Sequence, residues 1–192
     1  MRILEQDQFD EIIKALNGGL VVAVPTETVF GLAVKYDNNE AIEKLVSLKE
    51  RDRDSTKFFT LMLSGIDEIS KYGVSSGNAD KIAKENFPGE LTVVLRKNLD
   101  FANSYFDGFE TIGIRIPKHD FMLKLLQKAG PLIVTSANKK GLEEALDSKA
   151  VEKDLPEVDV VVNGISGDHL PSTVVDLTTN NPKILRQGRV VL

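Results

Sequence analysis

The chain has 192 residues, of which 42% are hydrophobic and 28% are charged, a composition that is ordinary for a globular domain. Its net charge of −5 argues against a protein whose whole surface binds nucleic acid, although a local basic groove is still permitted. With no cysteine and only two histidines, the sequence excludes disulfides and thiolate metal sites and leaves little material for a transition-metal site. No apolar run approaches the roughly 20 residues that span a bilayer, and the acidic N-terminus is unlike a signal peptide, so we expect a cytoplasmic protein without membrane segments.

Hydrophobic spacing predicts interleaved helices and strands. Ile12 and Leu16 share the apolar face of a first helix that Gly18-Gly19 ends, and Asn38 is a candidate N-cap for the second. In chain order, the predicted elements are a helix over 9–19, a strand over 20–24, a helix over 38–50, a strand over 58–63, a helix over 78–87, strands over 91–97 and 111–117, a helix over 119–130, and strands over 131–137, 158–164, 172–178, 183–188 and 189–192.

These elements predict one α/β domain over residues 1–192. Interleaved helices and β-branched strands favour a large central sheet with helices against it. Hairpin-like spacing near the C-terminus indicates that this sheet is mixed rather than purely parallel. No internal repeat, low-complexity segment or long Pro/Gly/Ser linker divides the chain.

The stretch from Val22 to Val34, VAVPTETVFGLAV, begins and ends like buried strand but is interrupted by polar residues. A plain turn would use Gly, Asn or Asp, which tolerate positive φ or cap their own backbone. Thr26, Glu27 and Thr28 offer little turn chemistry, but they do place hydrogen-bonding groups beside the core.

Other apolar strands also begin or end on polar residues. Because ligands collect in the crevice at strand ends of open α/β sheets, we expect such residues to converge on one site. Besides Thr26, Glu27 and Thr28, they are Lys49, Arg51, Arg53 and Lys57 in LKERDRDSTKFF, Thr135, Ser136 and Asn138 in VTSANKKG, and Ser172, Thr173 and Arg186 near the C-terminus.

Each of these features also has a purely structural interpretation. Ser136 and Asn138 are typical of a helix cap or an Asx-type turn, and the alternating charges of KERDRDSTK are typical of a solvated face. Arg115 interrupts an apolar strand, so it either lies on a half-exposed face or needs a protein carboxylate or an anionic ligand as its partner. The chain has no phosphate-binding P-loop, no G-x-G-x-x-G and no G-x-S-x-G motif.

Taken in order, the polar motifs resemble the YrdC family of threonylcarbamoyl-AMP synthases. The resemblance spans nearly the whole chain, through VPTETVFGLA, LKER, FPGELTVVL, TIGIRIP, PLIVTSAN, STVVDL and ILRQG. It implies a twisted mixed sheet flanked by helices, with a basic concave face that binds the ligand. It also implies the short, single-domain form of the family.

The family reaction joins L-threonine, bicarbonate and ATP, with Mg²⁺, to give threonylcarbamoyl-AMP and pyrophosphate. The resemblance therefore implies a nucleotidyltransferase whose product a separate protein complex transfers to A37 of tRNA as the t6A modification. No residue need act as a covalent nucleophile, because the protein supplies cations and alignment for attack on the α-phosphate.

The resemblance also assigns roles to individual residues. Lys49, Arg51, Ser136 and Asn138 match the family's catalytic Lys-x-Arg and Ser-x-Asn pairs. The implied threonine-binding residues are Thr26, Thr28, Thr60, Arg115 and Ser172, with Arg115 on the substrate carboxylate; the implied ATP-binding residues are Lys49, Arg51, Ser55, Thr111, Ser136, Asn138 and Arg186. Glu27 is left with two alternatives, ordering its loop or facing the substrate amine.

Some residues depart from the family pattern. Asp52 stands where a proline is common, Thr60 falls about where a histidine is common, and Phe30 replaces a tyrosine. The FTLM version of the strand resembles the YciO-like branch, whereas the intact TSAN argues against that branch.

Two alternatives to the synthase therefore stay open. One is a YciO-like paralogue with little or different activity. The other is a module that binds tRNA or double-stranded RNA through Lys49, Arg51, Arg53 and Lys57, against which the interleaved acids weigh because they oppose the phosphate field.

Overall fold

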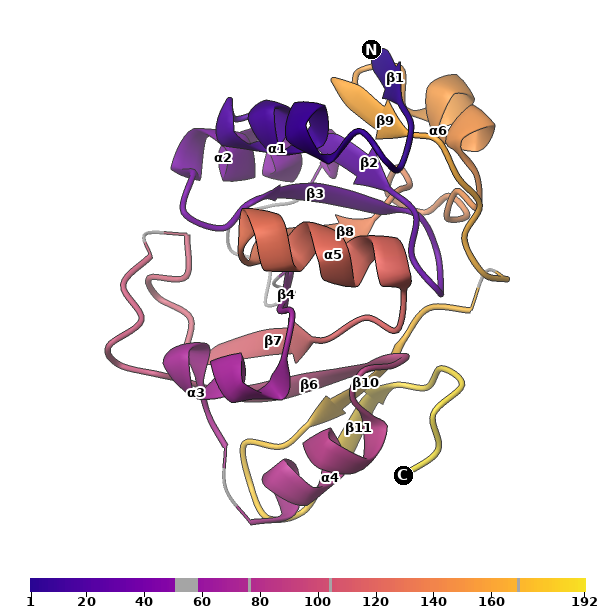
Figure 1. Cartoon of the computed structure of the whole chain (residues 1–192). Helices are drawn as coiled ribbons and strands as arrows, with labels where there is room; N and C mark the ends of the chain where they lie inside the picture. Colours follow the sequence, from indigo (N-terminus) through magenta and orange to yellow (C-terminus); the bar gives the residue numbers. More distant parts are fainter. Residues whose placement is uncertain (51–58, 76, 104, 169) are drawn as a thin grey trace.

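The computed structural model describes residues 1–50, 59–75, 77–103, 105–168 and 170–192, which build an eleven-stranded sheet flanked by helices (Figure 1). In this part of the chain the strand order is β1-β9-β2-β3-β8-β4-β7-β6-β10-β11, and β5 pairs with β6 outside that path. The strands are β1 (Arg2–Leu4), β2 (Val22–Val24), β3 (Gly31–Lys35), β4 (Thr60–Met62), β5 (Gly73–Val74), β6 (Leu91–Lys97), β7 (Thr111–Arg115), β8 (Leu132–Ser136), β9 (Val160–Val162), β10 (Thr173–Asp176) and β11 (Lys183–Arg186). The α-helices are α1 (Phe9–Asn17), α2 (Asn39–Leu48), α3 (Ile69–Tyr72), α4 (Asn78–Asn86), α5 (Asp120–Ala129) and α6 (Ser148–Asp154), and a 3₁₀ turn covers Ile66–Glu68.

The sheet mixes parallel and antiparallel neighbours, which confirms the predicted fold class. The pairs β1–β9, β2–β9, β4–β7 and β6–β10 are parallel, whereas β2–β3, β3–β8, β4–β8, β6–β7 and β10–β11 are antiparallel. The strands that carry the GLAV, TSAN, TLM and TIGIR sequences are consecutive neighbours in this order. Residues far apart in the chain are thereby brought to one region of the sheet.

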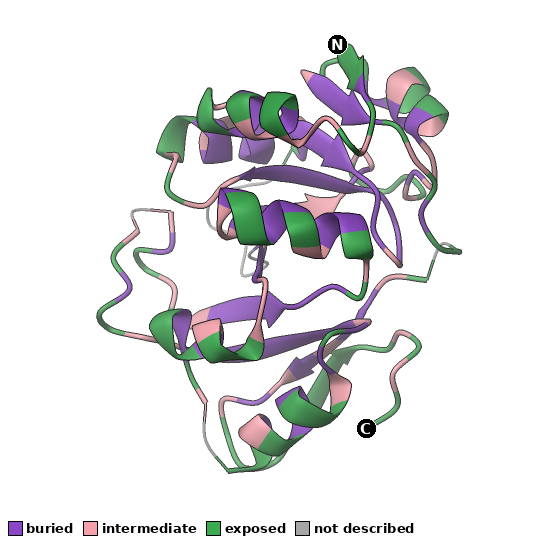
Figure 2. Cartoon of the chain, viewed as in Figure 1, coloured by how far each residue is buried: buried purple, intermediate pink, exposed green. Residues whose placement is uncertain are grey.

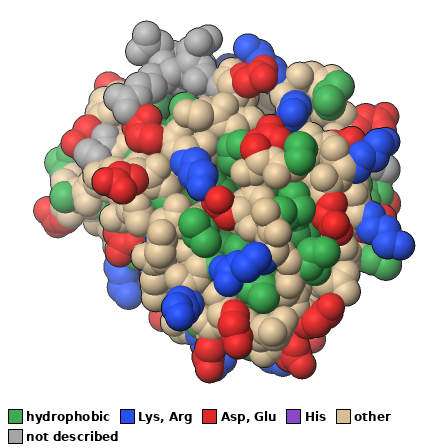
Figure 3. All heavy atoms as spheres, turned by 90° about the horizontal axis from the view of Figure 1, so that it is seen from above, with side chains coloured by type: hydrophobic (Ala, Val, Ile, Leu, Met, Phe, Trp, Pro, Cys, Tyr) green, Lys and Arg blue, Asp and Glu red, His purple; other side chains and the backbone are tan. Residues whose placement is uncertain are grey.

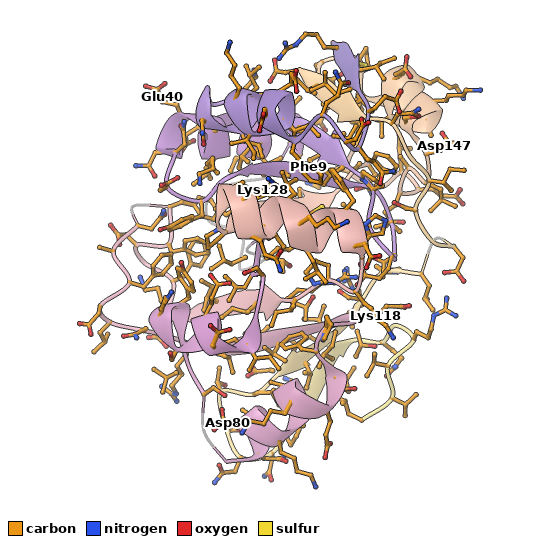
Figure 4. The ribbon with its side chains drawn as sticks, in the orientation of Figure 1. Phe9, Glu40, Asp80, Lys118, Lys128 and Asp147 are labelled. Carbon is orange, nitrogen blue, oxygen red and sulfur yellow. The ribbon has the colours of Figure 1, made fainter. Side chains whose placement is uncertain are left out.

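Different helices cover the two faces of the sheet, because successive side chains of a strand point to opposite sides. On one face α1 and α5 lie side by side over β2, β3 and β8, and the Phe9 ring stacks on Phe121 with centroids 5.6 Å apart (Figure 1). Lys128 of α5 places its Nζ 5.8 Å from the Phe9 centroid (Figure 4). The inward residues of α2, α3, α4 and α6 join a second apolar cluster, so the central strands are buried while each helix keeps an exposed side (Figure 2).

Local signals set several element ends as predicted. The Asn38 side chain accepts a hydrogen bond from the Ala41 N–H at 3.0 Å, which confirms it as the N-cap of α2. Strands β1 and β5 and helices α3 and α6 were not predicted, because they are short and lie in no longer apolar run, whereas the three-residue strands β2, β4 and β9 do. No helix in the described part of the chain combines the length and apolarity needed to cross a membrane.

The predicted strand over 189–192 is wrong. Beyond β11 the chain is turned back by hydrogen bonds from the Gly188 N–H to the Thr173 hydroxyl at 2.9 Å and from that hydroxyl to the Val190 carbonyl at 2.8 Å. These bonds hold the segment against the start of β10, where it pairs with none of the strands that the structure describes, and Val191 is 84% exposed. The composition of residues 189–192 is typical of a strand, but none of the described strands forms a ladder with them.

Candidate functional site

A cavity of about 480 Å³ lies where the ends of several strands meet. Its lining comes from the 26–31 segment, from β4, β6, β7 and β8, and from the β10–β11 pair with the residues before it. The lining residues are Thr26, Thr28, Val29, Phe30, Gly31, Phe59, Thr60, Met62, Thr92, Val94, Arg115, Val134, Thr135, Ser136, Pro171, Ser172, Val174, Leu185 and Arg186.

The pleat of the strands selects which side chains reach the cavity. In β6, Thr92 and Val94 line it, while the alternate residues Val93 and Leu95 belong to the buried core on the opposite face. β4 follows the same rule, because Thr60 and Met62 line the cavity on either side of the core residue Leu61. Alternation along these strands thus places the cavity-lining side chains on one face of the sheet and the core side chains on the other.

The Pro-Thr-Glu-Thr interruption forms a loop that closes one side of the cavity. The Thr26 hydroxyl lies 3.1 Å from the Thr28 hydroxyl and donates to the Val29 carbonyl at 2.7 Å. The Thr26 N–H donates to the Ser166 hydroxyl at 2.9 Å. Both threonines are almost fully buried, so their hydroxyls are held in place by the loop itself.

Arg115 ends β7 and is 5% exposed, which excludes the half-exposed alternative. Its Nη2 forms an ion pair with Glu27 Oε1 at 2.9 Å and donates to the Thr28 hydroxyl at 3.1 Å, and its Nε donates to the Gly89 carbonyl at 3.3 Å. A buried guanidinium needs such partners. The structure therefore supplies the protein carboxylate that the sequence predicted as one of its two partners.

Glu27 is fixed by the chain that follows β7. Its Oε1 also accepts the backbone N–H of Lys118 at 2.8 Å, just before α5 (Figure 4). Among the described residues, Glu27 Oε2 and His119 Nδ1 are buried without a hydrogen-bond partner. Burial lowers the pKa of His119, and the negative charges of Glu27 and Asp120 offset this only in part, so the imidazole is neutral at pH 7.

A second guanidinium lies on the C-terminal side of the cavity. Arg186 Nη2 donates to the Ser172 hydroxyl at 3.1 Å and its Nε to the Ser172 carbonyl at 3.0 Å. The Thr92 hydroxyl lies 2.9 Å from the Ser172 hydroxyl, so the two strands share one hydrogen-bonded cluster. Burial and the positive charge of Arg115 lower the pKa of Arg186, while Glu144 opposes this. The two cations thus repel each other, and an anion between them is favoured.

Lys49 lies behind the cavity wall. It follows α2, is 5% exposed, and its ammonium donates to the Ser136 carbonyl at 2.9 Å and to the Asn138 carbonyl at 2.6 Å. It also donates to the Asn138 side-chain oxygen, which in turn accepts the Ser136 hydroxyl at 2.8 Å. Lys49 and Asn138 therefore hold the turn that presents Ser136, and neither of them lines the cavity.

The structure brings together most of the residues predicted for the site. Arg51 and Ser55 lie outside the described residues, as do Asp52, Arg53 and Lys57. Thr111 begins β7, about 13 Å from Arg115 at the ~3.3 Å rise of a strand, and does not line the cavity. The predicted residues that do line it are Thr26, Thr28, Thr60, Arg115, Thr135, Ser136, Ser172 and Arg186.

Sequence reasoning missed Thr92 and left Glu27 unassigned. Thr92 carries the only hydroxyl in the apolar run LTVVL. Neighbouring residues of a strand point to opposite faces, so the alternation of Thr92 with Val93 could have predicted that Thr92 leaves the core face of the sheet. The partner of Glu27 lies 88 residues away along the chain, and nothing in the local pattern connects the two.

A close backbone approach also shapes the loop. A Cβ on Gly167 would lie 2.4 Å from the Glu27 carbonyl oxygen and 2.7 Å from that of Thr28. We expect Gly167→Ala to lower the melting temperature by about 5 °C, since backbone atoms cannot step aside and overpacking costs about 1–3 kcal/mol. Thermal unfolding measures this. Gly65→Ala is the matched control, because its Cβ would meet only the movable Asp67 carboxylate at 2.6 Å; equal losses in both variants would contradict the account.

The described residues contain no group of three or more His, Asp or Glu side chains arranged to hold a metal ion. The lining of the cavity is instead made of hydroxyls, apolar side chains and two guanidinium groups.

Comparison with known proteins places the chain in one family. Residues 14–188 match the Sua5/YciO/YrdC family model, whose description is "Telomere recombination". A threonylcarbamoyl-AMP synthase of Vibrio parahaemolyticus is 32% identical over 188 residues, covering 95% of this chain and 100% of that protein. The crystal structure of P. abyssi Sua5 with L-threonine superposes with a TM-score of 0.88 at 26% identity, over 98% of this chain and 58% of that one. E. coli YciO superposes with a TM-score of 0.87 at 26% identity, over 97% and 94% of the two chains. With its match to the family model extending from α1 to the end of β11, the chain belongs to the Sua5/YciO/YrdC family.

Proposed function

We propose that this protein is a threonylcarbamoyl-AMP synthase, a nucleotidyltransferase that forms threonylcarbamoyl-AMP and pyrophosphate from L-threonine, bicarbonate and ATP. The relative from Vibrio parahaemolyticus carries this name, and the P. abyssi Sua5 structure holds L-threonine. This chain spans 58% of that Sua5 chain, so the comparison supports the activity of the shared domain. The product would pass to the proteins that attach it to tRNA as t6A.

The observation that carries the proposal is the pair of guanidinium groups in one cavity. Arg115 and Arg186 both line it, and each is held by hydroxyls that line it as well, those of Thr28 and Ser172. Threonine presents a carboxylate and ATP presents phosphates, so both substrates need cations with fixed donors. The threonine hydroxyl would find acceptors and donors among Thr26, Thr28 and Thr60.

The proposed site divides between the substrates. Arg115 binds the threonine carboxylate, with Ser172 beside it, and Arg186 and Ser136 bind the nucleotide. Lys49 and Asn138 are proposed to serve the nucleotide by holding the turn that presents Ser136. Arg51 and Ser55, outside the described residues, and Thr111, which β7 carries away from the cavity, are proposed to complete the ATP contacts.

The chemistry needs position and charge rather than a protein nucleophile. The threonine amine, after losing a proton, combines with bicarbonate to give a carbamate and water. A carbamate oxygen then attacks the α-phosphorus of ATP, and the bond from that phosphorus to the bridging oxygen of pyrophosphate breaks. Fixed cations stabilise the charge that develops on the phosphoryl oxygens.

Mg²⁺ is proposed to enter with the nucleotide. It prefers phosphate oxygens and water to an all-protein cage, and when bound to ATP it neutralises phosphate charge. The hydroxyl-rich lining can hydrogen-bond to the water molecules of such an ion.

Pyrophosphate release from ATP tests the proposal. We expect release with threonine, bicarbonate and Mg²⁺ together, and a loss of at least about tenfold when threonine or bicarbonate is omitted. Release that ignores threonine would overturn the synthase assignment. Mass detection of threonylcarbamoyl-AMP in the same mixture identifies the product.

A YciO-like paralogue is the second candidate, favoured by Thr60 at the cavity wall, about where the family commonly has a histidine. It predicts nucleotide binding without threonine-dependent pyrophosphate release.

The remaining alternative is RNA binding, and its affinity would fall steeply as the salt concentration rises. On the face above α1 and α2, basic and acidic side chains are interspersed rather than gathered in a basic stripe (Figure 3).

A further inference from the structure

The carboxylate of Glu27 is held at the edge of the site in an unusual way. One oxygen, Oε1, accepts a hydrogen bond from the Lys118 N–H at 2.8 Å and lies 2.9 Å from Arg115 Nη2, with which it forms an ion pair. The other, Oε2, is buried and has no hydrogen-bond partner among the described residues. The two paired side chains are 13% and 6% exposed, so this is a buried ion pair rather than a surface contact.

The burial of Glu27 separates two possible roles. A carboxylate that received the substrate amine would have to line the cavity, and Glu27 does not. Its Oε2 is sealed from solvent, so a ligand in the cavity cannot reach that oxygen in this arrangement. Glu27 therefore acts on the site through Arg115.

The contacts of Arg115 with the protein determine which of its guanidinium nitrogens is available to a ligand. Nε donates to the Gly89 carbonyl, and Nη2 donates to the Thr28 hydroxyl and forms the ion pair with Glu27. Nη1 is then the guanidinium nitrogen to which no described residue is hydrogen-bonded, on a side chain that lines the cavity. A planar guanidinium held at Nε and Nη2 cannot rotate without breaking these bonds.

We propose that Glu27 is a positioning residue that locks the Arg115 guanidinium in the plane that presents Nη1 to the carboxylate of the amino-acid substrate. This inference rests on the proposed function, in which that carboxylate belongs to threonine. Glu27 makes no contact with the substrate. Because it already holds the Arg115 side chain in one conformation, less conformational entropy is lost when the substrate binds.

A double-mutant cycle on pyrophosphate release tests the inference. We expect Glu27→Ala to raise the threonine KM about tenfold, with the ATP KM changed by less than about twofold, since ordering one rotamer-rich side chain costs roughly one tenfold step. In an Arg115→Ala background the same substitution should add less than about twofold, because its effect is transmitted through that side chain. Full additivity, or equal effects on both KM values, would overturn the inference.

A conservative substitution of Glu27 separates its positioning effect from an effect of unfolding. Glu27→Gln keeps an oxygen that can accept the Lys118 N–H and lie beside Arg115 Nη2 but removes the charge, so we expect the threonine KM to rise only about threefold. A larger effect than that of Glu27→Ala would contradict the positioning role.

The matched control is Asp159→Ala. Asp159 likewise accepts a backbone N–H, from Val21 at 2.9 Å, and a cation, from Lys44 at 2.6 Å, but it does not line the cavity. Both KM values should stay unchanged in this variant. Wild-type protein that releases no pyrophosphate with threonine would overturn the proposed function, whereas active wild type with an unchanged threonine KM in Glu27→Ala would overturn only this inference.

Discussion

Replacing Arg115 with alanine is expected to raise the threonine KM about 100-fold and to change the ATP KM by less than about threefold. The side chain is 5% exposed and lines the cavity, so a charged hydrogen bond from it to a substrate carboxylate is poorly screened by water. Losing such a contact costs about 3 kcal/mol, which corresponds to roughly two tenfold steps in affinity. Initial rates of pyrophosphate release, with threonine and ATP varied separately, measure both constants.

Two variants make this result interpretable. Arg115→Lys keeps the charge but not the planar fork, so an intermediate increase of about tenfold is expected. Arg189→Ala removes another guanidinium, one that forms surface ion pairs with Glu90 and Asp168 and is 53% exposed, and it should alter neither KM. Alanine at 115 also leaves the Glu27 carboxylate without its cation, so rates are compared at temperatures where thermal unfolding shows the variant folded. Equal increases in both KM values would remove Arg115 from the carboxylate.

The fold was predictable where a hydrophobic period was long enough to read. α1, α2, α5 and β6 each carry a run of apolar residues at helix or strand spacing, and the structure places them within about two residues of the predicted ends. β11 was also predicted, although all its residues are exposed, as its green colour above α4 in the lower part of Figure 2 shows. The strand order was not predictable, because it depends on which strands pair across long loops.

The site was predictable as a set of residue types at strand ends, but its internal contacts were not. The expectation that polar residues at separate strand ends converge is matched by the common cavity, which six of those residues line: Thr26, Thr28, Thr135, Ser136, Ser172 and Arg186. Whether a residue touches the cavity or supports it depends on side-chain direction, which composition does not encode. Lys49 and Arg115 looked alike in the sequence, as cations next to apolar segments. The first donates to backbone and amide oxygens behind the wall, while the second lines the cavity and makes its described hydrogen bonds through Nε and Nη2.

Lys49→Met is expected to lower both the melting temperature, by about 10 °C, and kcat, by about 100-fold. Methionine approximates the length of the lysine stem but donates nothing to the Ser136 and Asn138 carbonyls, which accept the ammonium at 2.9 and 2.6 Å. Leaving buried oxygens unsatisfied costs roughly 3 kcal/mol in total, and each kcal/mol shifts the melting temperature by about 2–4 °C in a chain of this size. Thermal unfolding and pyrophosphate release at saturating substrates measure the two losses.

Whether the melting temperature and kcat fall together distinguishes a lysine that supports the turn from one that binds phosphate. Lys44→Met is the matched control on the same helix, where a 41% exposed side chain pairs with Asp159, and it should lower the stability by less than about 1 kcal/mol and leave kcat unchanged. If Lys49 acts by holding the turn that presents Ser136, activity and melting temperature fall together. An unchanged melting temperature with a raised ATP KM would contradict this account, because it would show that the bonds to the turn add nothing to the stability of the free protein and that the ammonium acts on the nucleotide.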